Sequence, residues 1–329
     1  MPARRAPRRP LGTPIDLSRV RTYPLAGRHS KVAATALGRL PTPGMSLGRF
    51  LDTLPDILAA RDLRAIARAI ADRHRAGGRL VLGMGAHPIK VGLSPLIIEL
   101  MRRGILSAVA MNGACIVHDF ELAFHGATSE DVAAALGTGE FGMAEETGRF
   151  LNTAIVRHGA LGLGAAVGKA ILDAKLPHRR LSILAQGARL GVPVTVHVAV
   201  GTDIIHMHPS ADGAAIGAAS LADFRRLAGV CEHLHRGVFI NLGSAVIIPE
   251  VFLKALNLAR NVGTRVGELV TVDMDFMRHY RPAVNVVQRP TQGDGKGYQL
   301  TGHHELMFPL LCAAIQQALA TPRRRARRS

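Results

Sequence analysis

The feature that most limits what this chain can fold into is a repeated change of hydrophobic period, from short apolar runs to helical spacing and back. The run at 79–83 is typical of a buried strand and ends at a glycine, and 94–103 follows as a helix that begins Ser-Pro. The next strand is predicted at 107–111, so the three segments form one βαβ unit. Repetition of this unit builds a mainly parallel sheet with helices on both faces.

The same alternation continues along the chain. Further strands are predicted at 181–185, 193–198, 203–207, 237–242 and 269–272. Helices are predicted at 144–157, 163–174, 220–233 and 249–261, and an amphipathic helix pair at 50–75. A chain of 329 residues with 48% hydrophobic residues can bury one large core. We therefore predict a three-layer, doubly wound α/β fold as a single large domain over residues 45–320.

Positive charge is concentrated at the two ends of the chain. Residues 1–32 carry eight basic groups and one acidic group, and residues 321–329 carry five arginines, so most of the net charge of +17 lies outside the predicted domain. Short arginine runs flanked by Pro and Ala do not pack, and we expect basic tails at 1–44 and 321–329. Weak, salt-sensitive contacts with polyanions are compatible with such tails, but no nucleic-acid-binding motif accompanies them.

Neither an export signal nor a membrane span is predicted. The paired arginines near the start are followed by charged residues instead of an apolar stretch, and the most apolar runs are interrupted before about 20 residues. The three cysteines, Cys115, Cys231 and Cys312, lack metal-ligand spacing and are typical of small buried residues in a reducing compartment. A cytoplasmic location is therefore expected.

The loops that follow the predicted strands carry the functional signal, because ligands of open α/β sheets bind beyond the carboxyl ends of the strands. Gly83 and Gly85 allow a backbone to approach a pyrophosphate at the start of the helix that begins at Ser94, although such a pair is also typical of a plain tight turn. Asp273 and Asp275 end a strand and could bind a ribose or simply face solvent.

Four of these segments, in this order, resemble the deoxyhypusine synthase family, especially its bacterial branch. They are GMGAHPIKVGLSPLIIELMRRG (83–104), AMNGACIVHDFELAFHGATSEDV (110–132), FGMAEETG (141–148) and FINLGSAVIIPEVFLKAL (239–256). The resemblance extends from about residue 45 to 318. It implies a Rossmann-like sheet, tightly bound NAD, a homotetramer, and transfer of the aminobutyl part of spermidine to an acceptor amine.

The resemblance and the loop chemistry together give a set of expected NAD contacts. They are Gly83, Gly85, Ala86, His87, Asn112, Gly113, Ala114, Gly243, Ser244, Asp273 and Asp275. No metal ion is expected in this site.

A polyamine requires carboxylates, because each ammonium that leaves water needs an opposite charge nearby. The acidic candidates are Asp119, Glu121, Glu145, Glu146, Asp203 and Glu250. Asp203 and Glu250 fall where the family places substrate contacts, and the expected substrate-binding residues are Asp119, Asp203, Glu250 and His303. For each of them, a surface ion pair or a helix-start acid is the competing interpretation.

The chain departs from the family at the catalytic lysine. Deoxyhypusine synthases carry a Trp-Gly-Lys segment whose lysine forms an imine with the aminobutyl group, and this chain has no Trp. Counting back from FPLLCAA (308–314), the expected position falls near Pro290. Lys296, in GDGKGYQL, is the predicted replacement nucleophile, with an exposed loop lysine as the alternative. Direct transfer to a free amine, with a homospermidine-like product, also remains open.

Two other functions compete with this assignment. A metal-dependent hydrolase could use His206 and His208, which would share one face of the strand predicted at 203–207, together with the pair His303 and His304. A chain that has lost its catalytic lysine could also persist as an inactive protein that binds NAD and polyamine.

Overall fold

The structure is a computed structural model, and it describes residues 10–321 of the chain. The arginine clusters within 1–9 and 323–328 lie outside the described residues. The described part forms one six-stranded parallel sheet in the order β3-β2-β1-β4-β5-β6. The strands are β1 (Leu80–Met84), β2 (Ala108–Asn112), β3 (Val194–His197), β4 (Val238–Leu242), β5 (Val270–Asp275) and β6 (Lys296–Thr301).

The strand order makes the sheet doubly wound, as the alternating sequence pattern predicted. The chain moves outward from β1 to β3, returns to the centre at β4 and then moves outward again to β6. The strand order therefore reverses between β1 and β4, where Gly83 is paired with Ala110 on one side and with Asn241 on the other. In folds of this class the crevice at such a reversal is the usual ligand site.

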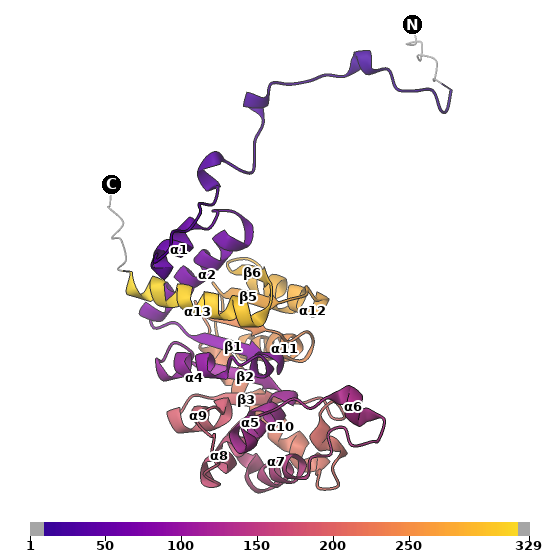
Figure 1. Ribbon diagram of the computed structural model, residues 1–329, viewed down its shortest axis with the longest axis vertical. Coiled ribbons are helices and arrows are strands. Elements are labelled where there is room, and N and C mark those ends of the chain that lie inside the picture. Colours follow the sequence, from indigo (N-terminus) through magenta and orange to yellow (C-terminus); the bar gives the residue numbers. More distant parts are fainter. Residues whose placement is uncertain (1–9, 322–329) are drawn as a thin grey trace.

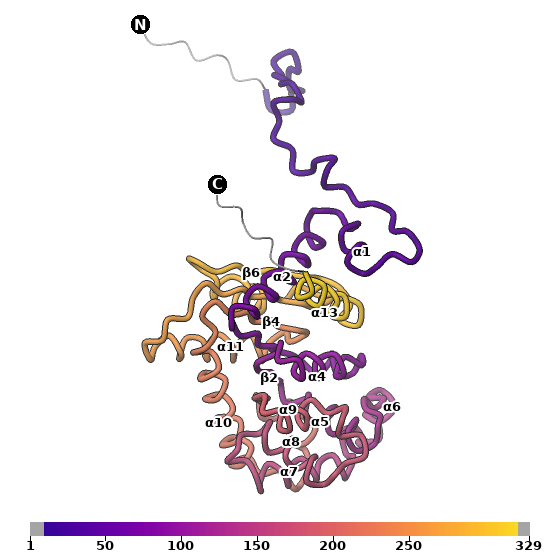
Figure 2. The backbone as a smooth tube through the Cα atoms, turned by 90° about the vertical axis from the view of Figure 1, so that its left-hand side faces the viewer, coloured from indigo at the N-terminus to yellow at the C-terminus, as the bar shows by residue number. Residues whose placement is uncertain are grey.

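Helices cover both faces of the sheet, so the molecule has three layers (Figure 2). Strand side chains alternate between the layers: Leu82 packs in the larger apolar cluster, and Val81 in the smaller one. The larger cluster is formed with α2 (Leu58–Arg75), α4 (Ser94–Arg102), α5 (Ala114–His125), α9 (Ile183–Leu190) and α13 (His304–Ala320). The smaller one is formed with α10 (Gly213–Glu232) and α11 (Ile247–Asn261).

The remaining elements extend or connect these layers. Beyond the β3 edge lie α7 (Glu145–His158) and α8 (Leu163–Asp173) (Figure 1). The short helices are α1 (Leu47–Thr53), α3 (His87–Lys90), α6 (Val132–Leu136) and α12 (Tyr280–Pro282). Residues 10–46 form an arm with three one-turn 3-10 helices that leads away from the sheet (Figure 1). Among residues 10–321, no single helix has the length and apolar composition needed to cross a membrane.

Two predicted strands are helical. Residues 181–185 open α9, because Ser182 caps the helix by accepting a hydrogen bond from Ala185 N (2.9 Å) and Gly191 ends it in the left-handed conformation. Residues 203–207 form a 3-10 turn, Ile204–Met207, in which the His206 ring accepts a hydrogen bond from Asp203 N (3.3 Å). Consequently, His206 and His208 do not share a strand face.

Candidate functional site

Two glycine loops meet where the strand order reverses. Gly85 N donates to Leu242 O (3.1 Å), and Gly243 N donates to Met274 O (3.0 Å), so the exits of β1, β4 and β5 are joined by main-chain hydrogen bonds. A Cβ atom at Gly85 would overlap Gly243 O, and Gly243 has a φ of +67°. These glycines thus allow the two loops to make direct backbone contact at the reversal of strand order.

A chain of polar side chains lies beside this contact. The Nδ1 atoms of His87 and His304 are 2.8 Å apart, and His304 Nε2 lies 3.5 Å from Asp275 Oδ1. His304 is 1% exposed, and its Nε2 makes no hydrogen bond of good geometry. Burial, followed by the neighbouring His304, lowers the pKa of His87. Burial would raise the pKa of Asp275, but His304 and the Phe276 amide lower it on balance.

Asn241, Ser244 and Asp273 form a second buried group at the same edge. Asn241 Nδ2 donates to Asp273 Oδ1 (2.8 Å) and to Ser244 O (2.9 Å), while Asn241 Oδ1 has no partner. Ser244 Oγ accepts a hydrogen bond from Ile248 N (3.2 Å) at the start of α11. Burial is the largest influence on Asp273 and raises its pKa to about 6.

A pocket of about 230 Å³ opens beyond the ends of β2 and β3. Its charged and titratable lining comes from separate segments: Lys90 from α3, His118 and Glu121 from α5, Glu130, and Asp203 after β3. The main apolar contributors include Ala114, Val117 and Phe141. The pocket therefore combines one lysine with several acidic groups at the edge where a ligand is expected.

Asp203 is the most deeply buried acid of this pocket. It is 7% exposed, and its Oδ2 atom has no hydrogen-bond partner. Burial raises the pKa of Asp203 to about 6. The carboxylate reaches this position because residue 113 is glycine, since a Cβ there would overlap Asp203 Oδ2. Gly113 and Asp203, both expected from the sequence, are thus brought together.

The protonation state of His118 follows from its contacts. The Thr128 hydroxyl donates its only proton to Glu121 Oε2 (2.5 Å), so toward His118 Nδ1 (2.7 Å) its oxygen can only accept. His118 Nδ1 therefore carries the hydrogen, and Nε2 keeps the lone pair. Burial, and to a lesser extent the charge of Lys90, lowers the pKa of His118 to about 4. At neutral pH this residue is an uncharged base in the pocket.

The other expected substrate contacts lie elsewhere. Asp119 is fully buried, and it accepts hydrogen bonds from Ser182 Oγ (2.5 Å) and Ile183 N (2.7 Å), so within this structure it anchors the start of α9. Glu250 pairs with Lys254 and Arg281 in a separate cluster. His303 is exposed and stacks on Phe276, with ring centroids 6.5 Å apart.

Lys296 is the expected residue that the structure separates most clearly from the site. It does not lie in a glycine loop but begins β6, and it pairs with Val270 at the amino end of β5. Asp275, at the carboxyl end, pairs with Thr301 five residues further along, which corresponds to roughly 16 Å. The Lys296 ammonium lies 5.0 Å from the Tyr298 ring centroid. Within the chain, Lys296 therefore lies away from the carboxyl edge, and its role as the nucleophile stays a prediction.

The remaining expected cofactor residues follow the glycine loops. Ala86 precedes α3, and Asn112 Oδ1 accepts a hydrogen bond from Cys115 Sγ (3.1 Å) at the exit of β2. The helix that directly follows the first glycine loop is the one-turn α3, so α4 begins only after Gly92. Ser94 Oγ at the start of α4 is buried and has no partner.

The histidines of the hydrolase alternative do not form one cluster. His206 Nδ1 accepts from Gly201 N (3.1 Å), and His208 Nε2 lies 2.9 Å from Gly142 O. His304 instead contacts His87. Over residues 10–321, no group of three or more His, Cys, Asp or Glu side chains is arranged to hold a metal ion.

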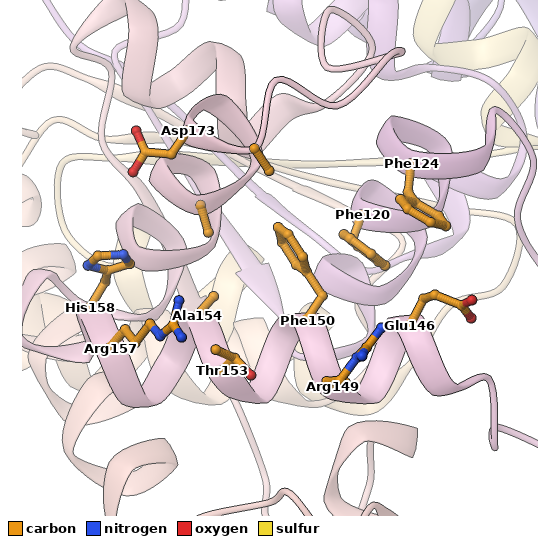
Figure 3. A pocket seen from close by; sticks show the side chains of 12 residues that line it. Phe120, Phe124, Glu146, Arg149, Phe150, Thr153, Ala154, Arg157, His158 and Asp173 are labelled. Carbon is orange, nitrogen blue, oxygen red and sulfur yellow. The ribbon is translucent and has the colours of Figure 1, made fainter.

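A larger hollow of about 520 Å³ lies between α5, α7 and α8 (Figure 3). Phe120 and Phe150 stack there with ring centroids 4.5 Å apart, and Arg149, Arg157 and Asp173 stand around them. None of its lining residues comes from a strand or from the glycine loops. We therefore place the candidate site in the smaller pocket.

Sequence reasoning missed Lys90 and His118 at this edge, and it considered His304 only as a possible metal ligand. Lys90 ends the segment GAHPIK directly after the first glycine loop, His118 precedes Glu121 by one helical turn, and His304 follows the exposed His303. For Lys90 and His118, closeness to the motif loops was the available signal. Nothing local distinguished His304 from His303, because the burial of His304 depends on β5 and on the loop of His87.

Comparison with known proteins supports the fold. No family model matches the chain. No curated protein matches it either. Among solved structures, a conserved protein assigned to the LOR/SDH group from Methanococcus maripaludis S2 is 14% identical, covers 88% of this chain and 75% of its own, and has a TM-score of 0.51. At this identity the likeness shows a shared α/β fold.

Two further neighbours are more distant. A protein assigned as a deoxyhypusine synthase from Entamoeba histolytica is 12% identical, covers 84% of this chain and 95% of its own, and has a TM-score of 0.49. AgrE, solved in a ternary complex with ornithine and NAD+, is 15% identical, with a TM-score of 0.49; the match covers 79% of this chain and 34% of AgrE. The chain spans about a third of the length of AgrE and of the cyanobacterial arginine dihydrolase ArgZ.

Proposed function

We propose that this chain is a deoxyhypusine synthase-like transferase that uses NAD to move the aminobutyl group of a polyamine, such as spermidine, to an acceptor amine. The four ordered motifs suggest the reaction. The observation that carries the proposal is the buried Asp203 carboxylate, whose Oδ2 is unpartnered in a pocket beside the glycine loops. We further propose a cytoplasmic homotetramer.

The residues present fit a dinucleotide and an amine side by side. Gly83, Gly85, Gly243 and Ser244 lie at the reversal of strand order, which is the usual ligand site of such sheets, and the glycines allow the neighbouring segments to pack closely there. Among buried polar atoms, Asn241 Oδ1, His304 Nε2 and Asp203 Oδ2 are unpartnered at or beyond this edge. Such atoms are rare in folded proteins and are commonly satisfied by a bound ligand or water.

Within this proposal the chain's residues hold the amine and manage its protons. Bound NAD supplies reversible removal of hydride from the carbon beside a secondary amine. Asp203 holds an ammonium group, because an ammonium close to a buried carboxylate compensates the cost of burying both charges. The secondary amine must lose a proton before oxidation, and the lone pair of His118 Nε2 can accept a hydrogen bond from this amine and orient it.

The experiment mixes the purified protein with NAD and spermidine and follows the absorbance of the reduced nicotinamide and the polyamine products. We expect transient reduction and a new polyamine when a free amine is supplied. Asp203→Asn should raise the spermidine concentration required by about 100-fold, because it removes a buried charge partner. Asp173→Asn, an exposed acid paired with Lys169, is the matched control and should behave as the wild type.

Two results would count against the proposal. Absence of nicotinamide reduction with spermidine, homospermidine and putrescine, in protein that binds NAD by calorimetry, would favour an inactive NAD-binding protein. If Asp203→Asn and Asp173→Asn required the same spermidine concentration, the amine would not bind in the Asp203 pocket.

A further inference from the structure

We propose that Lys90 is the nucleophile of this chain and forms the covalent imine with the amine fragment bound in the Asp203 pocket. This inference rests on the proposed function for its reaction, but the reactivity of Lys90 can be tested without it. Lys90 ends α3, immediately after the glycine loop of β1, and lines the pocket together with His118 and Asp203. It therefore lies between the two places where cofactor and amine are proposed to bind.

The other lysines of the described residues are less suited to this role. Lys169 and Lys254 pair with Asp173 and Glu250 on helix surfaces, and Lys296 lies at the opposite edge of the sheet. The other two are exposed and line no part of the pocket: Lys31 in the arm and Lys175 after α8. Within residues 10–321, Lys90 has no carboxylate within 4.0 Å. Its amine is thus available for a substrate atom.

The pocket also provides the groups that an imine exchange needs. A carbonyl or imine carbon is attacked only by a neutral amine, so the lysine ammonium must first transfer a proton. Lys90 is exposed, so its ammonium can lose this proton to water, and His118 Nε2 can accept a hydrogen bond from the neutral amine because Thr128 fixes the ring hydrogen on Nδ1. Asp203 holds the remaining ammonium of the substrate fragment, which keeps the reactive carbon near Lys90 and raises its effective concentration.

The steps balance without any further reagent. Hydride removal leaves a protonated imine between the substrate carbon and its own nitrogen. Neutral Lys90 Nζ adds to that carbon, the proton that Nζ then carries passes to the departing amine, and the bond between this amine and the carbon breaks. An acceptor amine then adds to the carbon bound to Lys90, and the bond between this carbon and Lys90 Nζ breaks. The hydride returns to the new imine and reduces it, so there is no net oxidation.

The first test needs no cofactor. The full-length protein is treated at neutral pH with 3-aminopropanal and cyanoborohydride, and the alkylated lysines are located by peptide mass spectrometry. We expect Lys90 to react at least about 10-fold faster than Lys296, with suppression by excess spermidine and loss of the preference in Asp203→Asn. Propanal, which lacks the ammonium, should show a smaller preference. Equal rates at Lys90 and Lys296 would overturn the inference.

The second test separates this inference from the proposed function. The protein is incubated with NAD and spermidine and trapped with borohydride, and Lys90→Arg is compared with the matched control Lys296→Arg. An aminobutyl adduct on Lys90 that is lost in Lys90→Arg alone supports the inference. Nicotinamide reduction without a Lys90 adduct leaves the proposed function standing and overturns Lys90. Absence of reduction counts against the proposed function, while the aldehyde test still decides the role of Lys90.

Discussion

At the carboxyl edge of the sheet, buried polar atoms stand without partners, whereas at the amino edge the charged groups are exposed and paired. Asp203 Oδ2, Asn241 Oδ1 and His304 Nε2 belong to the first group. At the amino edge, Arg236 forms two hydrogen bonds to Glu268, of 2.9 and 3.0 Å, and Lys296 lies over Tyr298. The two edges belong to the same strands, but these polar groups differ in burial and in pairing.

The difference shows where the fold can respond to a ligand. An unpaired buried group has a free energy cost that a bound partner removes, whereas an exposed ion pair is already satisfied and screened by solvent. Burial raises the pKa of both Asp203 and Asp273 to about 6, and both lie at the carboxyl edge. A cationic ligand is therefore expected to bind there, although the formal charge of the whole chain is +17.

The largest effect is expected from a side chain added between the two glycine loops. Gly85→Ala places a Cβ against Gly243 O, which is backbone and has little freedom to move. We expect the free energy of unfolding in urea to fall by about 3 kcal/mol. Gly217→Ala in α10 meets no atom within 4 Å and should instead stabilise by about 0.5–1 kcal/mol. Similar urea midpoints for both variants would contradict the close contact between the Gly85 and Gly243 loops.

The pH dependence of stability should change in opposite directions in two variants of the carboxyl edge. The pKa of Asp273 is raised from 3.8 to about 6 in the folded state. Its contribution to the stability of the fold is therefore present below pH 4 and is lost as the pH rises through 6. His197 has its folded pKa lowered from 6.5 to about 4, so its contribution is present above pH 6.5 and is lost as the pH falls through 4.

Each pKa shift changes the free energy of unfolding by about 3 kcal/mol across its pH range. In the wild type, Asp273 lowers the free energy of unfolding as the pH rises from 4 to 6, and Asp273→Asn should abolish this decrease. His197 raises the free energy of unfolding as the pH rises from 4 to 6.5, and His197→Gln should abolish this increase. Urea unfolding at closely spaced pH values measures both slopes. Slopes that change in the same direction would show that burial does not shift these two groups as described.

A smaller change is expected within the histidine pair. His304 lowers the pKa of His87, second to the effect of burial. His304→Gln should therefore raise the pKa of His87 toward its ordinary value and destabilise the fold by about 1–2 kcal/mol, since a buried contact is disturbed. Proton NMR titration of the His87 ring gives this pKa. His303→Gln, at the exposed neighbour, is the control, and an equal shift in both variants would contradict the His87–His304 contact.

The sequence was sufficient to predict most of the fold and only part of the site. Strands at 79–83, 107–111, 193–198, 237–242 and 269–272 are confirmed, because each is a short apolar run whose period differs from that of the flanking helices. The strand predicted at 181–185 is wrong: Ser182 and Gly191 bound a helix there, and Asp119, more than sixty residues away in the chain, also accepts a hydrogen bond from Ile183 N at its start. No local pattern contains that contact.

The site was harder to predict for the same reason. Asp203 was found through a motif, whereas Lys90 became a candidate only when its pocket was seen to include α5 and the segment after β3. Lys296 was misplaced because flanking glycines indicate a loop, while its strand is defined by pairing with β5. Individual residues with useful functional groups can be recognised in a sequence, but which of them lie close together depends on how the strands pair.

The smallest effect is expected at the amino edge, where Glu268→Gln removes the carboxylate partner of Arg236. Arg236 is exposed (67%) and Glu268 is partly exposed (33%), so solvent and salt already screen most of their attraction. We expect the Tm to change by less than about 2 °C, with the difference vanishing in high salt, and spermidine to protect this variant as well as the wild type. Calorimetric melts with and without spermidine measure both quantities. If spermidine failed to protect Glu268→Gln, the amine site would lie at the amino edge, and the proposed difference between the two edges of the sheet would be wrong.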